Sequence, residues 1–148
     1  MVDEHDFKAF PELTNSQMGA HYLDSPHKQI FRDFECNVKK VHDGDTITVD
    51  WSERDFNFPI RLARINAPEL NEEGGKEAHS WLEQQLLNED ITIQIDPKNR
   101  VEKWGRLLGT VFHTGMDIGQ EMLHNGFAKP FDERNEGKII NPIKEEAF

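Results

Sequence analysis

The sequence predicts a mainly β protein with a few helices, in the α+β class. Two observations support this prediction. Five short stretches alternate in polarity or are rich in β-branched residues, and one long helical period falls between the third and the fourth stretch. The chain has 148 residues, which suits a single domain with one hydrophobic core.

The five predicted strands are joined by polar connections that are rich in turn-forming residues. The strands are expected over residues 36–41, 46–51, 58–65, 91–96 and 107–113. "HDGD" joins the first two, and Gly44 within this turn is free to adopt a positive φ. Residues 97–106, "PKNRVEKWGR", are predicted to form a polar loop before the last strand.

Two helices are predicted from the spacing of apolar residues. The first covers residues 76–89, where apolar side chains recur at the i, i+3, i+4 and i+8 positions of a helix. These side chains are Ala78, Trp81, Leu82 and Leu86. The second lies within residues 117–126, with Gly126 just past its end. Its inward-facing residues are expected to be Ile118, Met122 and Leu123.

Five strands with a helix after the third form the pattern of an OB-fold barrel with packed accessory helices. A small α+β sheet has the same number of strands and stays open as an alternative. The domain is expected over residues 35–131. Residues 1–34 are an N-terminal extension with enough large apolar groups to pack partly on the domain. Residues 132–148 are predicted to be irregular.

Composition and charge exclude several classes of protein. The net charge of −11 argues against binding duplex nucleic acid over the whole surface, because phosphates repel an acidic protein. No apolar run is long enough to span a membrane, and the acidic N-terminus lacks the apolar core of a secretory signal. Together with the lone Cys36, these features predict a cytoplasmic protein that has no membrane partner. We also expect it to be a monomer.

The turn "HDGD" contains two acids that have two possible roles. Asp43 and Asp45 flank Gly44, and solvated turn acids are the common explanation for this pattern. The alternative is a site for a hard cation such as Ca²⁺, which prefers carboxylate oxygens.

A stiff turn follows the third predicted strand. In "NAPE", Pro68 fixes its own φ and favours an extended Ala67, so Glu69 has a defined direction. Glu69 is therefore either a common turn acid or a catalytic carboxylate.

Arg61 and Arg106 together could hold a phosphodiester, since each guanidinium offers paired donors. The seven histidines show no zinc-binding spacing, and the sequence has no P-loop and no GxSxG motif.

Taken in order, these motifs resemble the staphylococcal-nuclease-like (thermonuclease) family. The resemblance covers residues 36–131 and rests on five stretches of sequence. They are "VHDGDTITV", "IRLARINAPE", "GGKEAHSWL", "IDPKNRVEKWGRLLGTV" and "EMLHNGFAKPF". The family has a five-stranded OB barrel with packed helices, and its active members use Ca²⁺ to hydrolyse phosphodiester bonds of DNA and RNA. The resemblance therefore implies a calcium-dependent nuclease.

The resemblance also implies roles for single residues. Arg61 and Arg106 match the phosphate-binding arginines, and Glu69 matches the glutamate that contacts the attacking water. The positions that match the metal site and its neighbour are Asp45, Thr46, Asn66 and the backbone carbonyl of Ala67. Further substrate contacts are expected from Lys103, Trp104 and Phe131.

Two departures from the family pattern affect these roles. Asn66 stands where the family usually has a second aspartate, and Trp104 stands where a tyrosine often contacts a phosphate. A second hypothesis is therefore a weak or inactive OB-fold module that binds nucleic acid or protein. Because Arg61, Glu69 and Arg106 are all present, the enzyme is the favoured interpretation. Its acidic surface favours single-stranded or frayed DNA, or RNA, as substrate.

Overall fold

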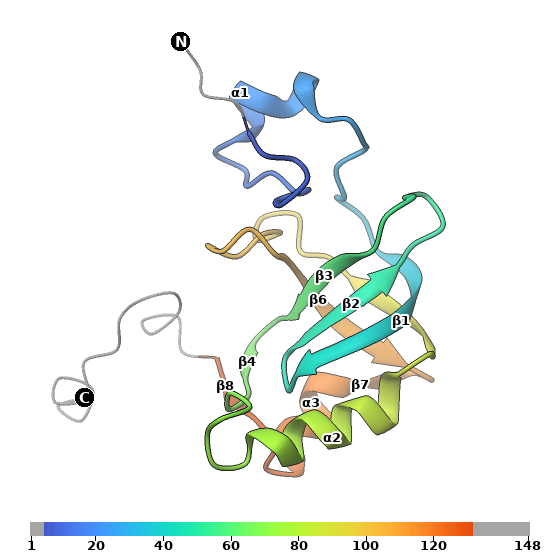
Figure 1. Ribbon diagram of the computed structural model, residues 1–148, viewed down its shortest axis with the longest axis vertical. Helices are drawn as coiled ribbons and strands as arrows, with labels where there is room; N and C mark the ends of the chain where they lie inside the picture. Colours follow the sequence, from blue (N-terminus) through green and yellow to red (C-terminus); the bar gives the residue numbers. More distant parts are fainter. Residues whose placement is uncertain (1–4, 132–148) are drawn as a thin grey trace, which may run out of the picture.

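The computed structural model describes residues 5–131 and shows a closed β-barrel with helices packed at one end (Figure 1). The barrel has five strands: β1 (Phe34–Asp43), β2 (Thr46–Asp50), β3 (Phe58–Leu62), β5 (Asp90–Gln94) and β6 (Leu107–His113). They pair in the order β3-β2-β1-β5-β6, and a parallel pairing of β3 with β6 closes the ring. This confirms the predicted α+β class and the five-stranded barrel. The expected segment 132–148 lies outside the described residues.

The third predicted strand, 58–65, is wrong as a single element. β3 ends at Leu62, and a turn at Ala63 and Arg64 follows, where Arg64 has a φ of 68°. The chain then forms β4 (Ile65–Asn66), which leaves the barrel and pairs with β8 (Lys129–Pro130). A left-handed φ is uncommon for arginine, so the sequence pattern gave no sign of this break.

The two predicted helices are present with slightly different bounds. α2 (Gly75–Leu86) buries the predicted Ala78, Leu82 and Leu86, and the ring of Trp81 lies 5.4 Å from that of Phe127. α3 (Ile118–His124) follows the short β7 (Met116–Asp117). Asp117 caps α3, since its side chain accepts a hydrogen bond from the Gln120 amide. Ile118 and Met122 are buried as predicted, whereas Leu123 is partly exposed.

Gly44 is required for a different reason from the predicted one. Its φ is not positive. Instead, a Cβ atom at this position would lie 2.5 Å from the Ala67 Cβ and 2.9 Å from the Ala78 Cβ. Glycine therefore lets the β1–β2 hairpin approach both α2 and the chain that follows β4.

Residues 5–33, here called the N-terminal segment, lie across the end of the barrel opposite α2 and α3 (Figure 1). The segment contains α1 (Met18–His21) and a short 3₁₀ turn, η1 (Tyr22–Asp24). Leu13 is fully buried, and Ile30 belongs to the barrel core. In Figure 1 the segment faces the loop of residues 97–106 that connects β5 with β6.

A buried ionic cluster fixes the N-terminal segment to the barrel. Glu12 is 2% exposed and pairs with both Arg54 and Arg100. Arg100 also donates hydrogen bonds to the carbonyls of Ile30, at 2.7 Å, and Leu13, at 2.6 Å. Because a buried charge is costly unless paired and hydrogen-bonded, this cluster strongly favours one position of the segment.

The remaining core is apolar and continuous through the barrel. Cys36, at 6% exposure, packs within it as a small hydrophobic residue, as expected. No helix within residues 5–131 combines the length and the apolar character needed to cross a membrane.

Candidate active site

Arg61 lies near the end of β3, and its side chain is held by the turn that follows. It is 5% exposed and donates hydrogen bonds to the backbone carbonyls of Leu62 and Ile65. It also donates to the Asn66 side-chain oxygen at 2.6 Å. The break between β3 and β4 brings these acceptors together around one guanidinium.

Asp45 begins the second half of the β1–β2 hairpin and faces Arg61. Its Oδ2 lies 3.4 Å from Arg61 Nη2 and accepts a 3.0 Å hydrogen bond from the Ala67 amide. Burial raises the pKa of Asp45 to about 6, the Arg61 charge opposes this shift, and the nearby Asp43 adds to it. Asp45 is thus a buried carboxyl with too little positive charge nearby to offset its burial.

The Thr46 hydroxyl joins Asp45 to the second arginine. It donates to Asp45 Oδ1 at 3.2 Å and accepts from Arg106 Nη1 at 3.0 Å. Because β2 pairs with β3, Thr46 lies directly opposite Arg61 in the sheet. The structure therefore connects Arg61 and Arg106 through Asp45 and Thr46.

Glu102 holds Arg106 in place, and the sequence analysis missed it. Its carboxylate accepts from Arg106 Nε at 3.2 Å and Nη2 at 3.1 Å, and its side chain is 2% exposed. Burial works to lower the pKa of Arg106, but its bonds to Glu102 and the charges of Asp45 and Asp43 outweigh this and raise it. The signal in the sequence was an acid four residues before Arg106 in "VEKWGR".

Glu69 lies in the turn between β4 and α2, and its backbone is well fixed. Its amide donates to the Glu72 side chain at 2.6 Å, and its carbonyl accepts from the Glu72 amide at 2.9 Å. A Cβ on Gly75 would come within 1.8 Å of that carbonyl, so the turn requires glycine there. The Glu69 carboxylate is exposed and makes no hydrogen bond to any described residue.

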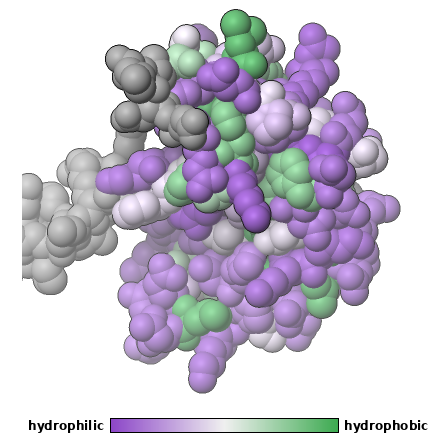
Figure 2. Space-filling model, turned by 45° about the horizontal axis from the view of Figure 1, so that its top comes forward, coloured by the Kyte–Doolittle hydropathy of each residue, from purple (hydrophilic) through white to green (hydrophobic). Residues whose placement is uncertain are grey.

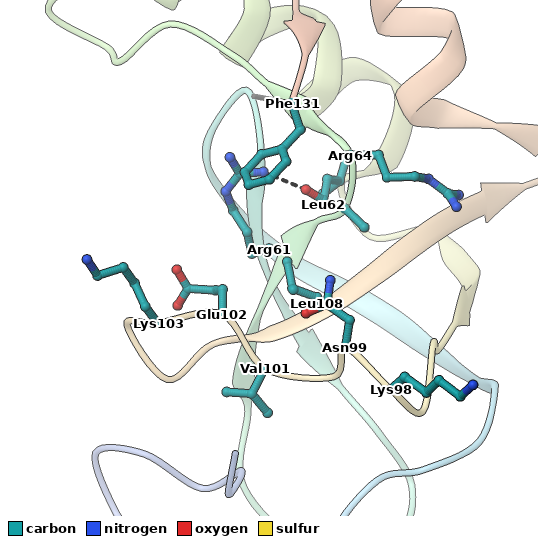
Figure 3. A pocket seen from close by; sticks show the side chains of 11 residues that line it. Arg61, Leu62, Arg64, Lys98, Asn99, Val101, Glu102, Lys103, Leu108 and Phe131 are labelled. Atoms are coloured by element: carbon teal, nitrogen blue, oxygen red, sulfur yellow. Dashed lines mark hydrogen bonds between the residues drawn. The ribbon is translucent and has the colours of Figure 1, made fainter. Parts of the chain in front are cut away.

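A cavity of about 520 Å³ lies beside Arg61, and Figure 3 shows the side chains that line it. Phe131 lies next to Arg61 in this view, and its amide donates to the Arg64 carbonyl at 2.9 Å. The charged side chains of the lining are Arg61, Arg64, Lys98, Glu102 and Lys103. Glu102 is paired with Arg106, so the cavity is lined mainly by cations although the whole chain is acidic.

Trp104 is apart from this cavity. It is 60% exposed and lines a different hollow, next to Phe10 of the N-terminal segment. Among the expected substrate contacts, Lys103 and Phe131 therefore lie near Arg61, whereas Trp104 does not.

The atoms that could hold a metal are all oxygens. Asp45 and Asn66 offer side-chain oxygens and Ala67 its carbonyl, which suits a hard cation such as Ca²⁺. The Asn66 oxygen already accepts a hydrogen bond from Arg61. Within residues 5–131 there is no group of three or more His, Cys, Asp or Glu side chains placed to bind a metal. A cation here would therefore depend on few protein charges.

Comparison with known proteins points to one family. A family model described as "Staphylococcal nuclease homologue" matches residues 59–147. An Escherichia coli O157:H7 protein named "Uncharacterized endonuclease" is 29% identical over 116 residues, which are 78% of this chain and 72% of that protein. A Haemophilus influenzae protein of the same name is 27% identical over 112 residues, covering 76% and 61%. The Aspergillus niger "Probable endonuclease lcl3" is 28% identical over 111 residues, covering 64% and 39%.

Proposed function

Because the chain belongs to the staphylococcal nuclease homologue family and has its nuclease domain, we propose that it is a Ca²⁺-dependent nuclease. The reaction is hydrolysis of phosphodiester bonds in DNA, RNA or both. One observation carries the proposal: the Thr46 hydroxyl and Asp45 connect Arg61 and Arg106, so that two guanidinium groups flank one carboxylate.

The two arginines bind and polarise the scissile phosphate. Attack by water builds negative charge on the phosphate oxygens, and positive groups fixed beforehand stabilise that charge without reorganising. Glu102 and Asn66 hold the two guanidinium groups, at distances of 3.1 Å and 2.6 Å. Some N–H donors of each guanidinium are already bonded within the protein. Only the remaining donors can bind the substrate, which favours a phosphate that approaches in one orientation.

Glu69 orients the attacking water and accepts its proton. Its carboxylate is exposed on a fixed backbone turn just after Ala67, which leaves it open to water and able to accept a proton. The proline at position 68 limits the motion of this turn, and accurate placement matters because an error of about 1 Å can lower the rate a hundredfold.

Asp45, Asn66 and the Ala67 carbonyl would hold Ca²⁺. The raised pKa of Asp45 supports this assignment, since a nearby cation would offset the cost of its buried charge. Bound Ca²⁺ supplies positive charge that stabilises the anionic phosphate. With a carboxamide at position 66, the protein offers Ca²⁺ less negative charge than two carboxylates would. The substrate phosphate adds negative charge at this site.

Single-stranded or frayed nucleic acid is the proposed substrate. The chain carries a net charge of −11, and the surface in Figure 2 is mainly hydrophilic with separate apolar groups. A rigid duplex would bring many phosphates near this acidic surface, whereas a flexible strand can follow the cationic cavity of Lys98, Lys103 and Arg64. The proposed active unit is a monomer.

Cleavage of plasmid DNA and of an RNA oligonucleotide, with Ca²⁺ and with EDTA, tests the proposal. Cleavage in Ca²⁺ that stops in EDTA is expected. Binding without cleavage in Ca²⁺ would instead favour an inactive OB-fold binding module. Cleavage that continues in EDTA would contradict the dependence on Ca²⁺.

A further inference from the structure

The N-terminal segment and the loop 97–106 enclose a second hollow, of about 470 Å³. Its walls include His5 and Phe10 from the segment and Lys103, Trp104 and Gly105 from the loop. Lys103 lines both this hollow and the cavity beside Arg61. The two spaces are therefore neighbours that share one cation.

Two aromatic rings of this hollow are open to solvent. Trp104 is 60% exposed and Phe10 is 44% exposed, which is unusual for such large apolar side chains. The Lys103 ammonium lies 5.4 Å from the centre of the Trp104 ring, within the range of a cation–π contact. An aromatic surface beside a cation is the combination that binds single-stranded nucleic acid, where bases stack and phosphates pair with cations.

Phe10 is held against the loop. A Cβ on Gly105 would lie 2.6 Å from Phe10 Cδ1, so the ring packs directly on the glycine backbone. Two hydrogen bonds close the turn that carries Phe10. The Phe10 amide donates to the Asp6 carbonyl at 2.9 Å, and His5 Nε2 lies 2.7 Å from the Phe10 carbonyl. A ring fixed in this way loses little freedom when a base stacks on it.

The acids near the hollow are already engaged. The Asp6 carboxylate accepts hydrogen bonds from the amides of Lys8 and Ala9, both at 3.1 Å. Glu12 is buried in its pairs with Arg54 and Arg100. The hollow is therefore lined by two aromatic rings with Lys103 beside them, an arrangement that suits a flat base whose phosphate lies at Lys103.

We propose that this hollow binds a nucleobase of the substrate strand, next to the nucleotide held beside Arg61. The base stacks with Phe10 and Trp104, and Lys103 contacts the phosphate between the two nucleotides. This inference rests on the proposed nuclease function, and it makes the N-terminal segment part of the substrate-binding surface. The ligand class is a single-stranded oligonucleotide longer than one nucleotide.

Equilibrium binding in EDTA tests the subsite without cleavage. The probes are a tetranucleotide and a 5′-mononucleotide, and the variants are Phe10→Leu, which loses the ring, and Phe10→Tyr, which keeps it. We expect Phe10→Leu to weaken tetranucleotide binding about fivefold or more, the size of one lost base stack, with mononucleotide binding unchanged. Phe10→Tyr should bind both probes as the wild type does.

Leu23→Ala is the matched control, because Leu23 belongs to the same segment and is 93% exposed but does not line the hollow. It should change neither affinity, and thermal melts should show that all variants are folded. Equal tetranucleotide affinity of Phe10→Leu and wild type would overturn the subsite, as would a wild type that binds both probes equally. If Phe10→Leu loses affinity but the wild type cleaves nothing, the subsite stands and the nuclease proposal fails.

Discussion

The Glu102 carboxylate accepts two hydrogen bonds from the Arg106 guanidinium, at 3.2 Å from Nε and 3.1 Å from Nη2. The carboxylate is buried and lies four residues before the arginine that it holds. Glu102 therefore holds Arg106 in place while Arg106 donates to the Thr46 hydroxyl. Glu102 itself is not expected to contact the substrate.

Glu102→Gln should lower kcat about tenfold with a smaller change in KM, because Arg106 loses the charged partner that fixes its orientation in the transition state. Steady-state kinetics on a single-stranded oligonucleotide give both constants. Glu102→Asp, which keeps the charge, should recover part of the rate. An unchanged kcat together with a lowered melting temperature would mean that Glu102 has only a structural role.

Asn66→Asp should lower the half-saturating Ca²⁺ concentration about tenfold, since calcium affinity follows the number of charged ligands. The maximal rate need not rise, because the added charge lies next to Arg61 and partly opposes its effect on the phosphate. Titrating Ca²⁺ in the activity assay measures this. Asn71→Asp adds the same charge at an exposed turn position and serves as the control. An unchanged half-saturating concentration in Asn66→Asp would remove Asn66 from the metal site.

Matched single- and double-stranded oligonucleotides at the same salt concentration should be cleaved at different initial rates, with the single strand faster. The physical reason is the net charge of −11, which opposes a rigid duplex more than a flexible strand. Equal or faster cleavage of the duplex would contradict this preference while leaving the active site itself unaffected.

Gly44→Ala should lower the free energy of unfolding by about 1–3 kcal/mol, the usual cost of inserting a group into packed space. The new Cβ would meet the Ala67 and Ala78 Cβ atoms at 2.5 and 2.9 Å. Gly19→Ala is the control, because its Cβ would have no neighbour within 4 Å. Urea denaturation of both variants checks this, and a Gly44→Ala protein as stable as wild type would show that the hairpin can shift at little cost.

The barrel could be predicted because its signal is local. Alternating residues such as those of "ITIQID" define strands, and the apolar period from Ala78 to Leu86 defines a helix, without knowledge of the rest of the chain. The break at Arg64 depends on strand pairing. β3 pairs with Gly109 of β6 inside the barrel, whereas β4 pairs with Lys129 of β8 outside it. Such a break leaves no trace in the alternation of the strand.

The site was partly predictable for a related reason. The motifs gave Asp45, Arg61 and Arg106, and the structure connects all three. Glu102 was missed although it lies only four residues before Arg106, and Glu12 was missed because its arginine partners are far away in the sequence. Those partners are 42 and 88 residues from Glu12.

The most direct test of the account is the rate of hydrolysis of one labelled single-stranded oligonucleotide under three conditions: wild type with Ca²⁺, wild type with EDTA, and Glu69→Gln with Ca²⁺. We predict rapid cleavage by the wild type with Ca²⁺ and none with EDTA. The rate of Glu69→Gln should be about a hundredfold or more lower, because the proton acceptor is lost, while its melting temperature is unchanged. A folded Glu69→Gln protein that cleaves at the wild-type rate, or a wild type that is equally active in EDTA, would contradict the proposed mechanism.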